Sequence, residues 1–116
     1  MIRLFVSGPS GRPTFLRQRI STLSTGFNLQ WDPPLQTSIN GEFLGYILTF
    51  RPKARYIKKT IEIRDESLKS QKYSLAGLQA HTTYIITLAA KNLEGTGPEA
   101  VIELRTEDGG ENTETQ

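Results

Sequence analysis

The chain has 116 residues, of which 36% are hydrophobic and 22% charged, and these values suit one globular domain with a core of its own. It contains no cysteine, which excludes disulfides, thiolate metal sites and thiol redox chemistry. Fourteen basic and twelve acidic side chains leave a net charge of +2, which indicates no particular partner. No apolar run approaches the roughly 20 residues of a membrane span, so we expect no direct membrane contact.

The two ends of the chain have the composition of linkers. Residues 1–13 combine an apolar stretch too short for a signal peptide with the sequence SGPSGRP, which favours an irregular connection. We expect a linker or the end of a preceding module there. Residues 107–116 are acidic and carry no apolar side chain, so an acidic flexible tail or linker is expected. The domain itself is predicted over residues 14–106.

Between these ends, apolar and polar side chains alternate as in strands with one buried face. The alternation predicts strands at FNLQW, GYILTF, IKKTIEI, KYSL, TYIITLAA and AVIELRT, with a less regular first strand around residues 14–20. Pro33-Pro34, Asn40-Gly41 and several later glycines mark the turns. Seven strands without helical periodicity predict an all-β, seven-stranded immunoglobulin-like β-sandwich.

One glycine-rich segment, GTGPEA (95–100), fits the G-x-G-x-x-G/A pattern of dinucleotide-binding turns. Such a turn opens a helix whose first N–H groups hold the pyrophosphate. Here Pro98 follows the second glycine, and an alternating strand pattern follows Pro98. The segment therefore predicts a turn between two strands, and no nucleotide is expected.

Residues with catalytic potential are scattered along the sequence. His81 is the single histidine and precedes a predicted strand in GLQAHTTY, so an exposed loop position is expected. Neither a metal-ligand cluster nor the G-x-S-x-G motif of a serine nucleophile is present. We expect no enzyme and no cofactor.

A basic cluster lies between positions 51 and 59. Its members are Arg51, Lys53, Arg55, Lys58 and Lys59. One interpretation is a solvated edge strand, because edge strands often carry lysine that discourages pairing with other chains. The other is a binding surface for a sulfated polysaccharide such as heparan sulfate, or for an acidic protein. Nucleic acid is not expected, because stacking aromatics are few and the net charge is low.

Two loops are predicted to meet a protein partner, because loops at the end of a sandwich carry binding without disturbing the core. They are residues 35–44 and 92–98. The candidate contacts are Leu35, Ile39, Phe43, Leu93, Glu94 and Thr96. For Phe43 and Leu44 there is an alternative, which is that their side chains cap the core.

Several spaced motifs point to one family. LQWDPP places Trp31 before a Pro-Pro pair, Leu78 and Tyr84 stand six residues apart, and Asn92 begins an N-x-x-G-x-G turn. The segment from residue 14 to 106 thus resembles a fibronectin type III domain, similar to those of neural cell-adhesion molecules and receptor tyrosine phosphatases. It departs from the family pattern at Ala80, where proline is usual, and has no Arg-Gly-Asp in the 92–98 loop.

The resemblance implies a structural role for Trp31, Tyr46, Leu78 and Tyr84. Leu78 and Tyr84 would form a tyrosine corner, in which the tyrosine hydroxyl is hydrogen-bonded to backbone a few residues upstream. Together with the inward faces of the predicted strands, the resemblance gives this structural core: Trp31, Tyr46, Leu48, Leu78, Tyr84 and Ile86.

The function implied by the resemblance is a non-enzymatic adhesion, protein-interaction and spacer module. Its setting would be the extracellular part of a multidomain cell-surface receptor or adhesion protein. Two alternatives stay open, which are heparan sulfate binding through residues 51–59 and an intracellular, cytoplasmic role as a sarcomeric or scaffold module.

Overall fold

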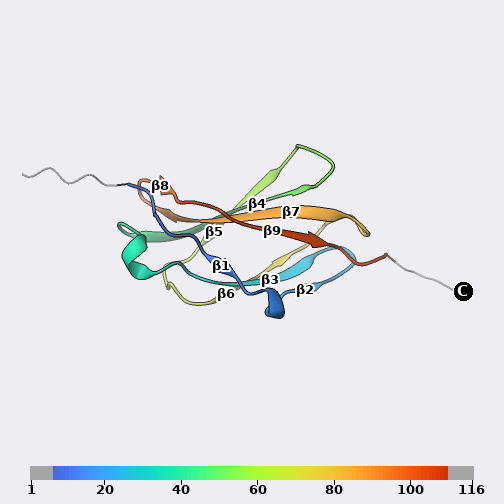
Figure 1. Cartoon of the computed structure of the whole chain (residues 1–116), viewed down its shortest axis with the longest axis horizontal. Coiled ribbons are helices and arrows are strands. Elements are labelled where there is room, and N and C mark those ends of the chain that lie inside the picture. The colour runs from blue at the N-terminus through green and yellow to red at the C-terminus, as the bar shows by residue number, and fades with distance from the viewer. Residues whose placement is uncertain (1–6, 110–116) are drawn as a thin grey trace, which may run out of the picture.

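The computed structural model describes residues 7–109, which form two antiparallel sheets packed face to face (Figure 1). The first sheet contains β1 (Thr14–Phe15), β2 (Ser21–Thr22), β3 (Phe27–Asp32) and β6 (Gln71–Leu75). The second contains β4 (Phe43–Pro52), β5 (Lys59–Arg64), β7 (Thr83–Asn92), β8 (Gly95–Thr96) and β9 (Ala100–Arg105). Short 3₁₀ turns span Arg17–Arg19 and Gln36–Ser38. None of the helical turns in this part of the chain has the length and apolarity to cross a membrane.

The predicted all-β sandwich is confirmed, but the count of seven strands is wrong. Nine strands are present in residues 7–109. The first predicted strand is divided into β1 and β2 by the 3₁₀ turn at Arg17–Arg19. The last one is preceded by the short β8, and Gly97, Pro98 and Glu99 separate β8 from β9. Proline has no N–H to donate, so the hydrogen-bonded ladder is interrupted where it stands.

The core lies between the sheets and comes from the apolar faces of the alternating strands. Trp31, Tyr46, Leu48 and Ile86 have no exposed surface, while Leu78 and Tyr84 are 7% and 4% exposed. The rings of Trp31 and Tyr46 meet edge to face, with centroids 5.3 Å apart.

The longest pairing joins β4 to β7 and sets the position of the β4–β5 hairpin. Its register runs from Phe43 opposite Asn92 to Pro52 opposite Tyr84, with a shift between Phe43 and Gly45. Strand β4 therefore continues beyond the predicted end at Phe50 and carries the connection 53–58 past the edge of the sandwich. Figure 1 shows this hairpin, drawn in green, projecting from the body of the domain.

The described part of the N-terminal segment, residues 7–13, lies against the sandwich. Pro9 and Pro13 are buried, and the backbone N–H of Ser10 donates to the Ser38 carbonyl at 2.8 Å. The first and last described residues lie at opposite ends of the domain (Figure 1). The predicted division into linker, domain and tail stays a prediction.

Candidate functional site

The β4–β5 hairpin carries the predicted basic cluster, and its first member is used inside the hairpin. One guanidinium nitrogen of Arg51 donates to the carbonyls of Pro52, Lys53 and Arg55 at 3.3, 3.2 and 2.9 Å. The same group lies 5.5 Å from the ring centre of Tyr56, within the range of a cation–π contact. Arg51 therefore holds the connection in shape and is not free to bind a ligand.

Lys53 is also engaged within the domain. Its ammonium lies 3.1 Å from a carboxylate oxygen of Glu103 on β9, and its backbone N–H donates to the Thr83 carbonyl at 2.8 Å. The Lys53 side chain is 59% exposed and the Glu103 side chain 50% exposed, so the pair contributes little to stability. It does reduce the charge that Lys53 presents to a partner.

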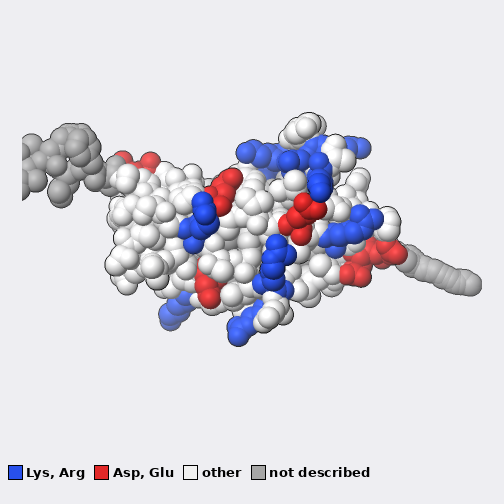
Figure 2. Space-filling view, viewed as in Figure 1, with Lys and Arg blue, Asp and Glu red and all other residues white. Residues whose placement is uncertain are grey.

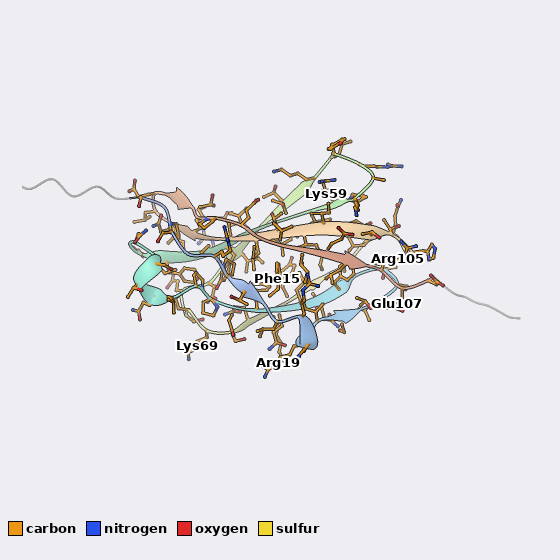
Figure 3. All side chains as sticks on the ribbon, viewed as in Figure 1. Phe15, Arg19, Lys59, Lys69, Arg105 and Glu107 are labelled. Carbon is orange, nitrogen blue, oxygen red and sulfur yellow. The ribbon has the colours of Figure 1, made fainter. Side chains whose placement is uncertain are left out.

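The other three cations face solvent. Within residues 7–109, no carboxylate lies within ion-pairing distance of Arg55, Lys58 or Lys59. Glu62, which lies on β5 with Lys59, is instead paired with Lys91, whose ammonium lies 2.7 Å from its carboxylate. This pairing lowers the pKa of the Glu62 carboxyl. Figure 2 shows lysine and arginine gathered over the projecting hairpin, and Figure 3 labels Lys59 there.

The hairpin also presents apolar surface. Ile57 was predicted to begin the strand IKKTIEI, but β5 begins at Lys59 and leaves Ile57 in the connection. Tyr56 is 91% exposed and Ile57 is 79% exposed. The sequence does carry a sign of this surface, because Tyr56 and Ile57 stand next to each other between Arg55 and Lys58. Such residues normally occupy a strand face, and here the pair lies in the connection between two strands.

Beneath the hairpin lies a hollow of about 240 Å³. Apolar atoms of Phe50, Ile57, Leu78 and Tyr84 line it, and Arg55 and Lys59 contribute the charged part of its lining. Gly77 and Gln79 add polar groups to the lining, so the hollow combines apolar side chains with polar groups and with two of the three unpaired cations.

The floor of this hollow is held by the predicted tyrosine corner. The Tyr84 hydroxyl accepts a hydrogen bond of 2.9 Å from the backbone N–H of Gln79, and the N–H of Leu78 donates to the Thr25 carbonyl at 2.9 Å. The connection between β6 and β7 is thereby fixed to both sheets.

A larger hollow of about 640 Å³ lies beside the first 3₁₀ turn. Its lining includes Phe15 together with Arg17, Arg19 and Asp32. Side chains of both charges are present, so this hollow indicates no particular class of ligand.

At the other end of the domain, Asn92 organises the turn between β7 and β8. Its side chain is 1% exposed, and its oxygen accepts from the backbone N–H groups of Glu94 and Gly95 at 2.8 and 3.2 Å. Its amide nitrogen donates to the carbonyls of Ser7 and Ile39 at 2.9 and 2.8 Å. The N-x-x-G-x-G sequence is thus a turn between paired strands, in agreement with the rejection of a dinucleotide site.

The sequence profile described as the fibronectin type III domain matches residues 11–104. The chain belongs to the fibronectin type III family. The solution structure of the third fibronectin III domain of the human KIAA0343 protein superposes with a TM-score of 0.73 and 21% identity, over 98% of this chain and 95% of that one. This likeness supports the fold.

Relatives of this fibronectin type III domain are found within long proteins. It is 40% identical over 99 residues to human receptor-type tyrosine-protein phosphatase F, covering 83% of this chain and 5% of that protein. It is 31% identical over 93 residues to the cell adhesion molecule Dscam1 of Drosophila melanogaster, covering 78% and 5%. The match to the putative receptor-type tyrosine-protein phosphatase mosPTP-1 of Aedes aegypti is 32% over 104 residues, covering 87% and 8%. The domain thus spans less than a tenth of these curated relatives.

The predicted protein-contact loops of this fibronectin type III domain divide into exposed and buried residues. Leu35 and Leu93 are 78% and 70% exposed, and Glu94 and Thr96 also face solvent. Ile39 and Phe43 are 2% and 6% exposed, so their selection as partner contacts was wrong.

Both corrections have a structural cause. The Phe43 ring packs edge to face on Tyr46, 5.3 Å between centroids, which is the alternative role of capping the core. Ile39 points into the core cluster because the turn at Gln36–Ser38 folds its segment back over the sandwich.

His81 lies in the connection before β7 of this fibronectin type III domain and is exposed, as expected. Its ring Nδ1 pairs with the carboxylate of Asp108, and its backbone N–H donates to the Glu107 carbonyl at 3.0 Å. In residues 7–109 there is no group of three or more His, Asp or Glu side chains that could hold a metal ion.

Proposed function

We propose that this fibronectin type III domain is a non-enzymatic protein-interaction and spacer module of a multidomain cell-surface receptor or adhesion protein. The observation that carries the proposal is the placement of the chain ends. The first and last described residues lie at opposite ends of the sandwich (Figure 1). This arrangement lets modules follow one another in a row, with each adding its length to the assembly.

The relatives support the same role. They are named as receptor-type phosphatases and a cell adhesion molecule, and the region shared with this chain is a small part of each. An extracellular location follows from the proposal. A heparan sulfate site and an intracellular scaffold role stay predictions from the sequence.

A non-enzymatic role is supported by the distribution of reactive groups. The titratable side chain with the largest pKa shift is Tyr46, whose pKa burial raises to about 12. This phenol lies in the core, where substrate does not reach it. The larger hollow includes Ser70 and Asp32, but the Ser70 hydroxyl donates to the backbone carbonyl of Trp31 at 3.2 Å. An acyl or phosphoryl transfer would need that hydroxyl hydrogen-bonded to a base.

The proposal is tested in the native parent protein. Intact cells that express the full-length parent are stained with an antibody against this domain, before and after permeabilisation. The proposal expects staining of intact cells, and staining that requires permeabilisation would contradict the extracellular role. Replacing the domain with an unrelated sandwich of similar length should keep the reach of the ectodomain but lose domain-specific adhesion.

A further inference from the structure

We propose that the β4–β5 hairpin is a docking site for an acidic polypeptide segment that carries an apolar side chain. The segment's carboxylates would meet Arg55, Lys58 and Lys59, and its apolar side chain would enter the hollow beneath the hairpin. This inference rests on the proposed function as a protein-interaction module and names the chemistry of the partner.

The small number of unpaired cations on the β4–β5 hairpin favours a partner that carries only a few negative charges. Of the five predicted cations, Arg51 is bound to the carbonyls of its own connection and Lys53 to Glu103. Three cations remain without an ion pair in residues 7–109. A few carboxylates on one peptide match three cations, whereas a sulfated polysaccharide draws its affinity from many simultaneous charge contacts.

The apolar part of the surface is what distinguishes a polypeptide from a polysaccharide. Ile57 is 79% exposed at the edge of the hollow, and Phe50, Leu78 and Tyr84 continue the apolar lining inward. A cavity of about 150 Å³ lined by apolar side chains holds benzene, so 240 Å³ accommodates an aromatic or aliphatic side chain. A sulfated sugar offers only the C–H faces of its rings and has no aliphatic or aromatic side chain to place there.

The shape of the site is fixed before a partner arrives. The Arg51 guanidinium holds the connection through three carbonyls, and the Tyr84 hydroxyl holds the floor through the N–H of Gln79. Within residues 7–109, strand β5 pairs with β4 alone, so this part of the chain leaves one side of the hairpin open to an approaching chain. A preformed site loses less conformational entropy when it binds.

The test is a selection from a random dodecapeptide display library with the complete 116-residue chain as bait. Peptides that bind the Ile57→Ser, Lys58→Glu double variant as well as they bind the unmodified chain are removed by counter-selection. The expected peptides carry two or more acidic residues beside an aromatic or aliphatic residue. When such a peptide is added, the amide NMR shifts of the chain should change most at Ile57, Leu78 and Gln79. The affinity for the peptide should fall at least tenfold in Ile57→Ser and in Lys58→Glu, each made alone.

Matched controls separate the site from general effects. Leu93→Ser removes an apolar side chain that is 70% exposed at the other end of the domain, and Lys69→Glu reverses a charge away from the hairpin (Figure 3). Both should bind selected peptides within twofold of the unmodified chain. Dispersed amide spectra of every variant show that the sandwich is intact.

Two further probes define the outcomes that overturn the proposal. A heparin octasaccharide that binds the chain and the Ile57→Ser variant equally would make the hairpin a polysaccharide surface. Phosphatidylserine vesicles that bind through Tyr56 and Ile57 would make it a membrane contact. A library that yields no peptide distinguishing the bait from the double variant would also overturn it. None of these results alters the surface-staining test of the proposed function.

Discussion

The hydroxyl oxygen of Tyr84 on β7 accepts a hydrogen bond of 2.9 Å from the backbone N–H of Gln79, five residues earlier in the chain. This contact ties a core strand to the connection that forms the floor of the hollow. It leaves the aromatic ring buried against Phe27, with ring centroids 6.1 Å apart. The ring and the hydroxyl of Tyr84 can therefore be tested separately.

Replacing Tyr84 with Phe keeps the ring and removes the hydroxyl. The N–H of Gln79 then loses its partner, so we expect the free energy of unfolding to fall by about 1–2 kcal/mol. Urea denaturation measures it. Tyr56→Phe is the control, because that side chain is 91% exposed, and it should leave the free energy unchanged. Equal stability of the two variants would show that the hydroxyl of Tyr84 contributes nothing.

Asn92→Ala should be among the most damaging polar substitutions in the domain. The side chain is buried and bonds to backbone groups of three segments, including Ser7 and Ile39, so its loss leaves several of them unpaired. We expect a loss of about 3 kcal/mol, measured by denaturation, and faster hydrogen exchange at Glu94 and Gly95. Asn28→Ala, an exposed asparagine on β3, should cost much less. Similar losses from both substitutions would contradict the role of Asn92.

Gly45→Ala and Gly95→Ala form a matched pair. Both glycines have φ angles that side chains rarely adopt, +133° and +144°, so each substitution should cost about 1–3 kcal/mol in backbone strain. At Gly45 a Cβ would also clash with the Ile63 carbonyl oxygen, whereas at Gly95 it would meet no atom of residues 7–109 within 4 Å. We expect Gly45→Ala to be the more destabilising, by about 1–3 kcal/mol. Thermal denaturation gives the difference, and its absence would mean that β5 moves aside readily.

The stability of the domain should fall at high pH because of Tyr46. Burial raises the pKa of this phenol to about 12, above its ordinary value of 10.0. The unfolded chain therefore loses this proton first, so the contribution is fully present below pH 10 and is lost as the pH rises toward 12. Over that interval the loss should be on the order of 2 kcal/mol.

Denaturant titrations at several pH values measure this slope. The Tyr46→Phe variant should lose that part of the dependence, and Tyr56→Phe should keep it, since Tyr56 is almost fully exposed. An unchanged slope in Tyr46→Phe would assign the alkaline loss to other groups.

The fold could be predicted because its signals are local. The alternation in TYIITLAA places Tyr84 and Ile86 on one face, and the structure buries both. The division of the first strand by the turn at Arg17–Arg19 could not be read, since no glycine or proline marks it. Ile39 and Phe43 were misplaced because a loop position was taken to mean exposure, although this loop folds back over the core.

The site could be predicted only in part, because charge partners depend on contacts between distant residues. The sequence identified five neighbouring cations, but the pairing of Lys53 with Glu103 joins residues 50 positions apart. The folding of Arg51 onto the carbonyls of its own connection depends on the exact path of the backbone after Pro52. The hollow requires the register that brings Tyr84 opposite Pro52.

The bonds of Asn92 also determine how the domain would carry mechanical tension. Asn92 ends β7 and holds Ser7, while the strand that leads to the C-terminus, β9, pairs with β7 from Arg105 opposite Thr83 to Ala100 opposite Leu88. A pull on the N-terminal side reaches β1 along the backbone and β7 through the Asn92 bond to Ser7, while a pull on the C-terminal side draws β9 the other way. The hydrogen bonds between β7 and β9 are then loaded in shear, all at once. They resist together, whereas a strand peeled from its end would lose its bonds one after another.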